Sequence, residues 1–597
     1  MRAIVILILL FIAWGSHAAT VTNDAVVGTL CSDGLVYSAG CPSTSPTYIV
    51  DSTAANNLGD GKSWATRWNT ISDVNAGVSQ EGADVCLMTG SRWSEKLTID
   101  WSGASDGSDN VIVQSCYRDT SNSDAVTPYS SGSGNGRGTK AGLGYETESC
   151  FASITCGAIY DSPPSGGSTT SGQISITSPR HDIQVLDVKV EYVAGIGVNV
   201  VGAGSNVGSM GSIARIRLAG LDVYATGRQG VRFANGAQDF ILENSTVAEE
   251  GQCLVQWRAN ATGPCSGACC GGSVLIQNYS SRGLIENNTV SRAIGEGIGH
   301  NNNVEAVITR GNRIGNTRSA ILYCERCGHI DGLPAIPVVL ESNILWGSEP
   351  AQGDFGNGYP SFAAKSGGSG GTVVLETGSS NANAIYRNNL MASGGDWGNA
   401  TRDPLAEAGD VVKLQARHYG NSIGNVEATV TINGGRDSDG DGVEFYAARS
   451  NIYNNPASTA AEVCSKTSWT TGFTGDFGYN VRAVNPSSTF CLATDGSERL
   501  GDARFATTLA TLNTRNYANP PTMADFALLA GSPALNSGDP GLDNQTCAAL
   551  ADYGTFIRPY MDYPFVPNET TWNKCLAIDF DGTARNDLTP DRGAIEQ

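Results

Sequence analysis

The chain of 597 residues has little charge, few histidines and almost no long apolar runs. Charged residues make up 16% of it, and Asp and Glu outnumber Lys and Arg by 58 to 37, which gives a net charge of −21. This acidic balance argues against a nucleic acid as partner, because the phosphate backbone would be repelled at long range. Beyond the N-terminus no stretch reaches the ~20 apolar residues that a membrane span requires, so we expect no membrane insertion.

The single long apolar run stands at the N-terminus. Arg2 precedes an apolar stretch over 3–13, and small residues follow at Ser16 and Ala18. This order is typical of a cleavable secretory signal, so we expect residues 1–18 to be removed and the mature chain to be secreted, either extracellular or periplasmic. The sequence gives no indication of an oligomeric state.

The chain has 16 cysteines, all of which follow the expected signal. In an exported protein an even number of cysteines favours disulfides. Three close pairs are candidate bridges: Cys31/Cys41, Cys150/Cys156 and Cys324/Cys327. Alternatively, "CSGACC" (265–270) and "CERCGH" (324–329) could supply zinc ligands, with His329 completing the set.

A short motif with an asparagine between apolar residues recurs along the middle of the chain. Six copies occur: "LENSTV" (242–247), "IENNTV" (285–290), "TRGNRI" (309–314), "LESNIL" (340–345), "IYRNNLM" (385–391) and "ARSNIY" (448–453). The shortest interval, from Asn288 to Asn312, fits one coil of a solenoid. Short β-branched stretches lie around the copies, at 183–190, 213–223, 304–308 and 338–340. Such strands fit coils that stack on one another, with the asparagine amides hydrogen-bonded along the axis.

Four further segments resemble a known group of folds. "YIVDSTAANNLGDGKSWATRWNTI" (48–71) and "GADVCLMTGSRWSEKLTIDWSGASDGSDNVIVQSC" (82–116) resemble the opening of secreted bacterial proteins of the pectate-lyase-like superfamily. "FALLAGSPALNSGD" (526–539) and "DFDGTARNDLTPDRGAIEQ" (579–597) resemble their closing segments. The resemblance implies an all-β fold, a right-handed parallel β-helix with capping segments at both ends. We expect an N-terminal cap and first coils over 19–170, the main coils over 171–455, and irregular coils with a cap over 456–597.

Superposing the coils on their asparagine corners brings together four strands, "QGVRF" (229–233), "QCLVQW" (252–257), "EGIGH" (296–300) and "SAILY" (319–323). The residues expected on their inner face are Val231, Leu254, Ile298 and Ile321. Those expected around the preceding turn are Arg228, Glu250, Glu296 and Arg318. Glu250 and Glu296 could act as the two carboxyl groups of a glycoside hydrolase, which stand roughly 5 to 9 Å apart. Alternatively, they form surface ion pairs.

His300 and several aromatic residues are further candidates in this region. The imidazole suits proton transfer at neutral pH, although the superposition places His300 in phase with Phe233 and Tyr323, which favours a partly buried position. Aromatic faces stack on sugar rings. We therefore consider three aromatic residues as substrate-binding, together with Arg228: Trp257, Tyr323 and Trp397.

The segment "DVVKLQARHYG" (410–420) suggests a different reaction. Its alternation directs Lys413 and Arg417 outward, and His418 follows at once. Elimination from a uronate requires a cation near the carboxylate and a base that removes the ring proton. Exposed Lys and Arg resemble the groups that polysaccharide lyases of this superfamily use, so we consider Lys413, Arg417 and His418 as catalytic.

The segment "RDSDGDGVE" (436–444) could bind Ca²⁺. Asp437, Asp439 and Asp441 alternate as in a hard-cation loop. The twelfth position is Ala448 rather than Glu, which excludes an EF-hand and leaves a looser calcium turn or a solvated loop.

Together these features predict a secreted carbohydrate-active protein that binds and cleaves a polysaccharide on a β-helix face, by elimination or by hydrolysis. The alternative is a non-enzymatic adhesion or structural protein that uses the same long face.

Overall fold

The computed structural model describes most of the chain between residues 29 and 537. The described residues are 29–33, 35–37, 41, 47–54, 59–104, 110–118, 140–144, 172–193, 195–204, 212–248, 272–293, 295–317, 320–328, 337–346, 373–376, 382–394, 399–401, 414–419, 421–426, 430–433, 443–454, 464–467, 474–483, 496–512, 514–515 and 519–537. Within these ranges the helices are short: η1 (Trp64–Thr66), α1 (Ile71–Gly77), α5 (Leu509–Leu512) and η6 (Met523–Phe526). None of them is long and apolar enough to cross a membrane.

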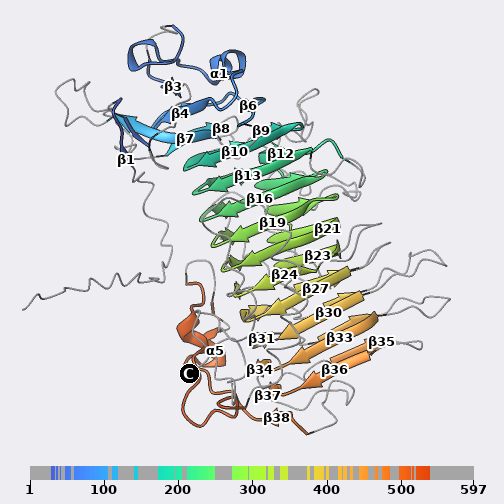
Figure 1. Ribbon diagram of the computed structural model, residues 1–597. Helices are drawn as coiled ribbons and strands as arrows, with labels where there is room; N and C mark the ends of the chain where they lie inside the picture. The colour runs from blue at the N-terminus through green and yellow to red at the C-terminus, as the bar shows by residue number, and fades with distance from the viewer. Residues whose placement is uncertain are drawn as a thin grey trace, which may run out of the picture.

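Three parallel sheets run along the molecule (Figure 1). Sheet I contains β3 (Thr47–Val50), β4 (Asp84–Met88), β7 (Val111–Arg118), β10 (Arg180–Leu186), β13 (Ile213–Ala219), β16 (Ala237–Glu243), β19 (Ser281–Glu286), the second half of β21 (Ile298–Arg310), β24 (Val338–Glu341), β27 (Ala382–Arg387), β30 (Leu414–Tyr419), β33 (Val443–Arg449) and β36 (Thr474–Gly478).

Sheet II contains β5 (Arg92–Trp93), β8 (Ala141–Gly144), β11 (Val188–Val193), β14 (Asp222–Thr226), β17 (Thr246–Ala248), β20 (Thr289–Ser291), β22 (Arg313–Gly315), β25 (Ile344–Trp346), β28 (Leu390–Gly394), β31 (Ser422–Val426), β34 (Ile452–Asn454), β37 (Val481–Arg482) and β38 (Arg499–Leu500). Sheet III contains β6 (Leu97–Ile99), β9 (Gly172–Thr177), β12 (Ile196–Val201), β15 (Val231–Ala234), β18 (Val274–Gln277), the first half of β21, β23 (Leu322–Cys327), β26 (Val373–Glu376), β29 (Asn399–Thr401), β32 (Val430–Asn433) and β35 (Cys464–Thr467).

From β4 to β35 the chain visits the three sheets in a fixed order, so that each of these coils contributes one strand to each sheet. In one coil, for example, β16, β17 and β18 follow one another, and β19 then returns to pair in parallel with β16. This repeating arrangement is a parallel β-helix, which confirms the fold predicted from the asparagine motif.

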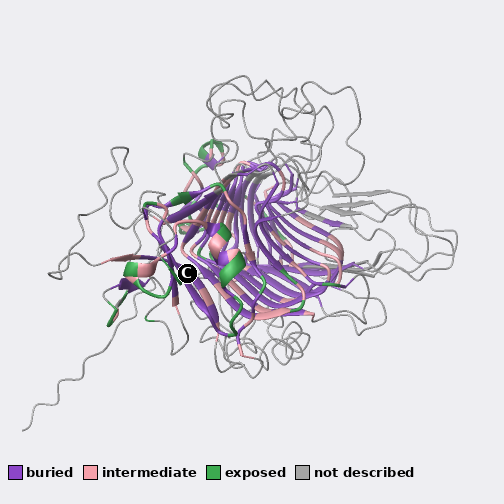
Figure 2. Cartoon of the chain, turned by 90° about the horizontal axis from the view of Figure 1, so that it is seen from above, coloured by how far each residue is buried: buried purple, intermediate pink, exposed green. Residues whose placement is uncertain are grey.

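Apolar side chains fill the interior of the coils. Strand alternation directs every second residue inward, and parallel register stacks like positions: Val185, Leu218, Leu242 and Ile285 align in sheet I. All four are fully buried. Seen along the axis, buried residues line the three sheets around this core (Figure 2). The core therefore extends along the coils instead of forming one compact centre.

An asparagine ladder marks the corner between sheets I and II. Asn312 illustrates the pattern: its Oδ1 accepts from the backbone N–H of Asn288 at 2.9 Å and from Nδ2 of Asn288 at 3.0 Å, while its Nδ2 donates to the carbonyl of Ile285. The same contacts link Asn288, Asn312, Asn343, Asn389, Asn421, Asn451 and Asn480. All seven are buried. The predicted ladder is confirmed for five of the six copies. In "LENSTV" the ladder position is taken by Ser245, whose backbone N–H donates to Asn288 Oδ1 at 2.9 Å, rather than by Asn244. Asn421 and Asn480 are members that the sequence pattern did not reveal.

The corners also explain two strands that were predicted too long. Stretches 183–190 and 213–223 each span a strand of sheet I and the next strand of sheet II. Between them the backbone turns at Asp187 (φ 53°) and Gly220 (φ 63°). The left-handed conformation at these residues ends one strand and redirects the chain.

The predicted alignment of sheet III is wrong by one residue in one coil. Ile298 pairs with Leu322, where Ile321 was expected. The coil before it contributes β18, whose Val274 pairs with Val231 and Ile298. Val274 therefore takes the place in the inner column that was assigned to Leu254, which lies outside the described residues.

Two of the predicted disulfides are present, Cys31–Cys41 and Cys324–Cys327. Cys150 and Cys156 lie outside the described residues. Because zinc requires thiolates, the disulfide excludes Cys324 and Cys327 as zinc ligands in this state, and that alternative is wrong for them.

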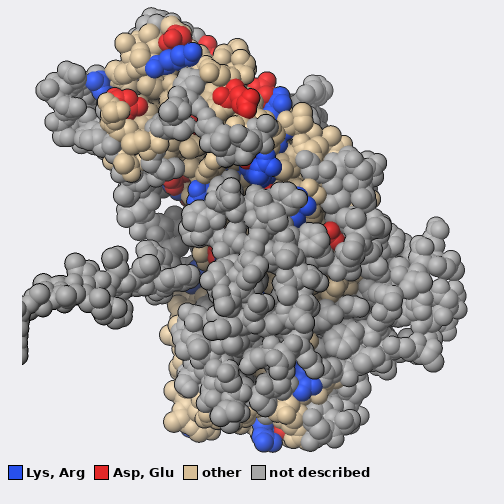
Figure 3. Space-filling view, in the orientation of Figure 1, with Lys and Arg blue, Asp and Glu red and all other residues tan. Residues whose placement is uncertain are grey.

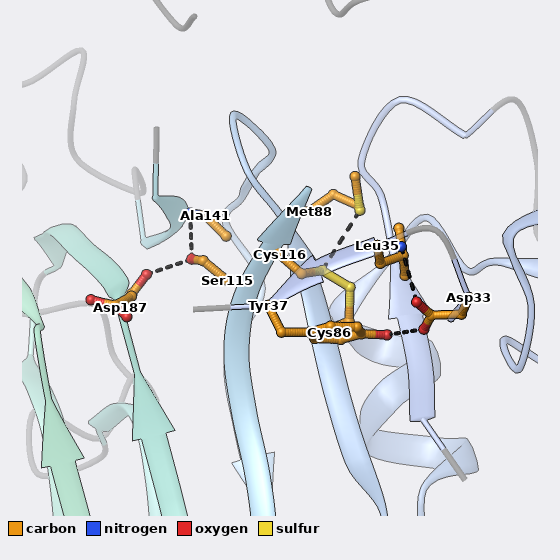
Figure 4. The surroundings of a disulfide bond; sticks show 9 residues. All are labelled: Asp33, Leu35, Tyr37, Cys86, Met88, Ser115, Cys116, Ala141 and Asp187. Atoms are coloured by element: carbon orange, nitrogen blue, oxygen red, sulfur yellow. Dashed lines mark hydrogen bonds between the residues drawn. A yellow bond between two sulfur atoms is a disulfide. The ribbon is translucent and has the colours of Figure 1, made fainter. Parts of the chain in front are cut away.

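A third disulfide, Cys86–Cys116, was not predicted from the sequence (Figure 4). It joins β4 to β7 beneath the antiparallel pair β1 (Thr29–Leu30) and β2 (Leu35–Tyr37). Both cysteines are fully buried, and they pack with Leu35 and Tyr37 in a small separate core. Tyr37 Oη donates to Asp33, and burial, followed by this carboxylate, raises the pKa of Tyr37. The disulfide therefore fastens the first coils where the hairpin covers sheet I.

Replacing Cys86 and Cys116 together by alanine is expected to lower the free energy of unfolding by about 3 kcal/mol, because the crosslink no longer restricts the unfolded chain. Urea unfolding measures the change. As a control, Cys31→Ala with Cys41→Ala opens a bridge of sequence separation 10 instead of 30, and a smaller loss is expected. An equal or larger loss in the control would contradict this reasoning.

The C-terminal segment returns to the side of the helix. Phe505, Leu512, Phe526 and Leu528 pack on outward side chains of sheet II, among them Trp346. Arg313 on β22 donates to the carbonyl of Pro521 at 3.1 Å, and burial lowers the pKa of this arginine. Described residues between 503 and 535 thus cover one flank of the coils.

Candidate functional site

The outer face of sheet III brings polar side chains of successive coils into register. Because Val231, Ile298 and Leu322 point inward, the residues next to them point outward. Two outward rows result: Asn199, Arg232, Leu275, Gly299 and Tyr323 form the first, and Val201, Ala234, Gln277, Asn301 and Glu325 form the second. Asn199, Leu275 and Ala234 are buried. Neighbouring coils lie about 4.8 Å apart, so an extended ligand could contact several of the half-buried members at once, namely Arg232, Gln277, Asn301, Tyr323 and Glu325.

Glu296 lies over this face just before β21. A methyl group built on Gly299 would stand 3.0 Å from Oε2 of Glu296, 3.2 Å from Cδ1 of Leu275 and 3.4 Å from Oδ1 of Asn301. Glu296 is only 5% exposed, whereas Asn301 and the neighbouring Tyr323 are half-buried. A carboxylate and an amide thus approach one glycine, and Tyr323 pairs with that glycine in the next coil.

Two arginines lie on the same face in an earlier coil. Arg228 precedes β15, where its backbone N–H donates to Gly195 at 3.0 Å, and Arg232 is on the strand itself. Burial, and to a lesser extent the nearby Arg228 guanidinium, lowers the pKa of Arg232. With its amide oriented to accept, Gln277 lies 3.0 Å from Nε of Arg232. Arg228 and Glu296 occupy the same turn two coils apart, roughly 10 Å along the axis.

His300 lies inside the coils. It stacks in register between Ile276 and Cys324 and is fully buried. Its Nε2 is 3.0 Å from Oγ1 of Thr309, across the interior. Burial lowers the pKa of His300 to about 4. A side chain in this position contacts no polysaccharide, so we correct the catalytic assignment of His300 to interior packing.

His418 is likewise an interior residue. Its ring stacks on Tyr386 with 4.7 Å between ring centroids, and burial lowers its pKa to about 3. His418 therefore cannot act together with Lys413 and Arg417 on a substrate at the surface, as was predicted. Arg417 pairs with Ile385 in sheet I, a different sheet from the one that presents Glu296. Lys413 and the side chain of Arg417 lie outside what the structure describes.

Several other candidates fall outside the described residues, and their roles stay predictions. These are Glu250, Arg318, Trp257, Trp397, Asp437, Asp439 and Asp441. Among the residues that are described, no group of three or more His, Cys, Asp or Glu is arranged to hold a metal ion. Calcium binding by Asp437, Asp439 and Asp441 therefore stays a prediction from the sequence.

The structure places residues on the Glu296 face that sequence reasoning missed. They are Arg232, Gln277, Gly299, Asn301 and Glu325. Each stands at an outward position of a sheet III strand, so strict alternation from the inward Ile298 could have identified Gly299 and Asn301. The remaining three required the register between coils, which only the pairing shows.

The outer face of sheet I differs, because its charges pair with one another. Arg217 with Glu243 and Arg310 with Glu286 each lie at 2.6 Å, and Arg387 contacts Glu341. Side chains of both signs also appear among the described residues of the surface in Figure 3. Such pairs join neighbouring strands, which gives them a structural role along sheet I.

Comparisons with known proteins find no close relative of the chain. No family model matches the chain, and no curated protein matches it. Among solved structures, pectate lyase Pel9A is 13% identical over 93% of this chain and 97% of its own, with a TM-score of 0.40. An alginate lyase from Paenibacillus sp. str. FPU-7 is 14% identical over 61% and 97%, with a TM-score of 0.36. The A-module of mannuronan C-5 epimerase AlgE6 from Azotobacter vinelandii is 11% identical over 72% and 89%, with a TM-score of 0.37.

Proposed function

We propose that the protein is an exported carbohydrate-active enzyme that binds and cleaves a polysaccharide along the outer face of sheet III. The observation that carries this proposal is the approach of Glu296 and Asn301 to Gly299, with Tyr323 paired to Gly299 in the next coil. Carboxylate and amide groups bind sugar hydroxyls, and an aromatic ring packs against the apolar face of a sugar. The disulfides fit an oxidising compartment outside the cytoplasm.

In this proposal Glu296 exchanges the proton at the scissile bond. A shielded carboxyl group within reach of the substrate is suited to general acid or base catalysis. Hydrolysis requires a second carboxyl group, for which Glu250 and Glu325 are candidates; Glu325 is one coil beyond Asn301. Arg228 and Arg232 would then bind a negatively charged group of the substrate.

Elimination is the second candidate reaction. It would use Lys413 and Arg417 on sheet I to bind a uronate carboxylate, but His418 is not available as the base because its ring lies in the interior. Calcium bound by Asp437, Asp439 and Asp441 would stiffen their loop and take no part in the chemistry.

The test is an activity assay on the purified mature protein with uronate-containing and neutral polysaccharides, with and without calcium. Reducing ends report cleavage, and new ultraviolet absorbance reports the unsaturated uronate that elimination forms. We expect Glu296→Gln to lower kcat at least about 100-fold, because the amide cannot transfer the proton. The matched control is Glu191→Gln on sheet II, a half-buried carboxylate 3.7 Å from Lys189, with an expected change of less than twofold.

The outcomes separate the alternatives. Reducing ends without absorbance would identify a hydrolase, and absorbance would identify a lyase and direct substitutions to Lys413 and Arg417. Equal activity of Glu296→Gln and wild type would refute the role of Glu296. Binding without cleavage across the panel would favour an adhesion or structural protein.

A further inference from the structure

Gly299 is a glycine that the backbone does not require. It lies within β21, in extended conformation, and is not among the described residues of positive φ. Glycine weakens a strand because it leaves a gap in packing and costs backbone entropy. Its neighbours in the same outward row, Leu275 and Tyr323, carry large side chains. The absence of a side chain at this one position therefore needs a local reason.

The local reason is the space that Glu296 occupies. With Oε2 of Glu296 3.0 Å from the position of an added methyl group, any larger residue would press on the carboxylate. Leu275 Cδ1 at 3.2 Å and Asn301 Oδ1 at 3.4 Å also lie close to that position, so the added methyl group would have little free space around it. Glu296 is 95% buried, since only 5% of it is exposed, so few other positions are open to its side chain.

We infer that Gly299 is a positioning residue for Glu296: it leaves the space in which the Glu296 carboxylate rests against the outer face of β21. This inference rests on the proposed function and adds to it. It explains the orientation of the acting carboxyl group by the absence of a side chain at Gly299, beside which Leu275 and Asn301 also lie. A methyl group at Gly299 would displace the carboxylate by a few tenths of an ångström. For comparison, a displacement of about 1 Å at a reacting group costs roughly 100-fold in rate.

The test is a double-mutant cycle on the purified mature protein with the polysaccharide that the wild type cleaves. Gly299→Ala is expected to lower kcat at least tenfold with a KM within about twofold of wild type, because the methyl group displaces the carboxylate without blocking substrate binding. In the Glu296→Gln background the same substitution is expected to change kcat less than twofold. The carboxylate that the methyl group displaces is then already absent, and the effects of two coupled substitutions do not add.

The matched control is Gly478→Ala on β36 of sheet I. A methyl group there would meet Ser497 Oγ at 3.1 Å and Arg449 Cζ at 3.4 Å, which is nearly the same crowding away from Glu296. The control is expected to lower the unfolding midpoint by a similar amount and to leave kcat within twofold of wild type.

The failures are distinguishable. A wild type that cleaves nothing overturns the proposed function and this inference with it. If the wild type cleaves, kcat losses that multiply in the double variant, or equal kcat values for Gly299→Ala and Gly478→Ala, overturn the inference alone.

Discussion

Acidification from pH 6.5 to pH 3 is expected to lower the free energy of unfolding by several kcal/mol through two interior histidines. Burial lowers the pKa of His300 to about 4 and that of His418 to about 3. The unfolded chain binds these protons near pH 6.5, so it gains protons before the folded state does. The free energy of unfolding therefore has its full value above pH 6.5 and decreases as the pH falls toward the two lowered pKa values. At 1.36 kcal/mol per pKa unit, His300 contributes about 3 kcal/mol and His418 about 5 kcal/mol to the loss.

The measurement is urea unfolding at a series of pH values. His418→Phe, which keeps a ring against Tyr386, is expected to remove about 5 kcal/mol of the fall between pH 6.5 and pH 3. The control is Ile276→Val beside His300 in the same column, which lowers stability by about 1 kcal/mol at every pH because it only removes a methylene group. A His418→Phe profile parallel to that of the wild type would refute the titration argument.

Asn343→Ala is expected to cost about 3 to 5 kcal/mol of unfolding free energy. Asn343 Oδ1 accepts from both the backbone N–H and Nδ2 of Asn312, and its Nδ2 donates to the carbonyl of Thr309 at 2.9 Å. All these groups are buried, and each one left without a partner costs about 1 to 3 kcal/mol. Removing one amide thus breaks contacts in two neighbouring coils at once.

Chemical unfolding of Asn343→Ala and of a surface control measures this cost. Asn519 is exposed and accepts a hydrogen bond from Arg515 at 2.8 Å, so Asn519→Ala is expected to change stability by less than about 0.5 kcal/mol. If the two variants lose equal stability, the ladder is not a major source of cohesion between coils.

The fold was predictable because one short motif combines a left-handed residue, a ladder asparagine and flanking apolar residues. A left-handed residue precedes the ladder asparagine, as Asn287 (φ 56°) precedes Asn288, and apolar residues flank both. Asn480 meets the same requirement, since Tyr479 (φ 55°) precedes it. In "YGNSI" around Asn421 and "GYNVR" around Asn480, however, the flanking residues differ from the motif. The ladder contacts are made between coils, so a search for similar neighbours in sequence does not find every member.

The site was predictable only in part because its definition depends on register. Matching Ile298 to Ile321 shifted one coil by one residue, and alternation then placed Tyr323 in phase with the inward His300. The structure keeps the 24-residue spacing of Asn288 and Asn312, which aligns Ile298 with Leu322 and directs Tyr323 outward. A one-residue shift exchanges the two faces of a strand.

Arg228 and Glu296 were found because they flank strands whose inward residues are unmistakably apolar. His300 and His418 were misassigned because sequence alone does not distinguish an outward histidine from an inward one. The interior accepts them through a hydrogen-bonding hydroxyl at Thr309 and a stacked ring at Tyr386. Those partners are distant in the sequence, so the alternation of residues along a single strand does not predict them.

The flank formed by the C-terminal segment has a consequence for the order of folding. Phe505, Phe526 and Leu528 pack on Trp346 and its neighbours in sheet II, a surface that exists only after β25, β28 and β34 have stacked. Contacts between such distant parts of a chain form slowly, because a long loop must close before they contribute. As the chain is made or exported from its N-terminus, the coils can add one upon another, whereas the flank has to wait for the last segment. Until that segment arrives, an apolar strip of sheet II faces water, and this is the interval in which the protein is most exposed to aggregation.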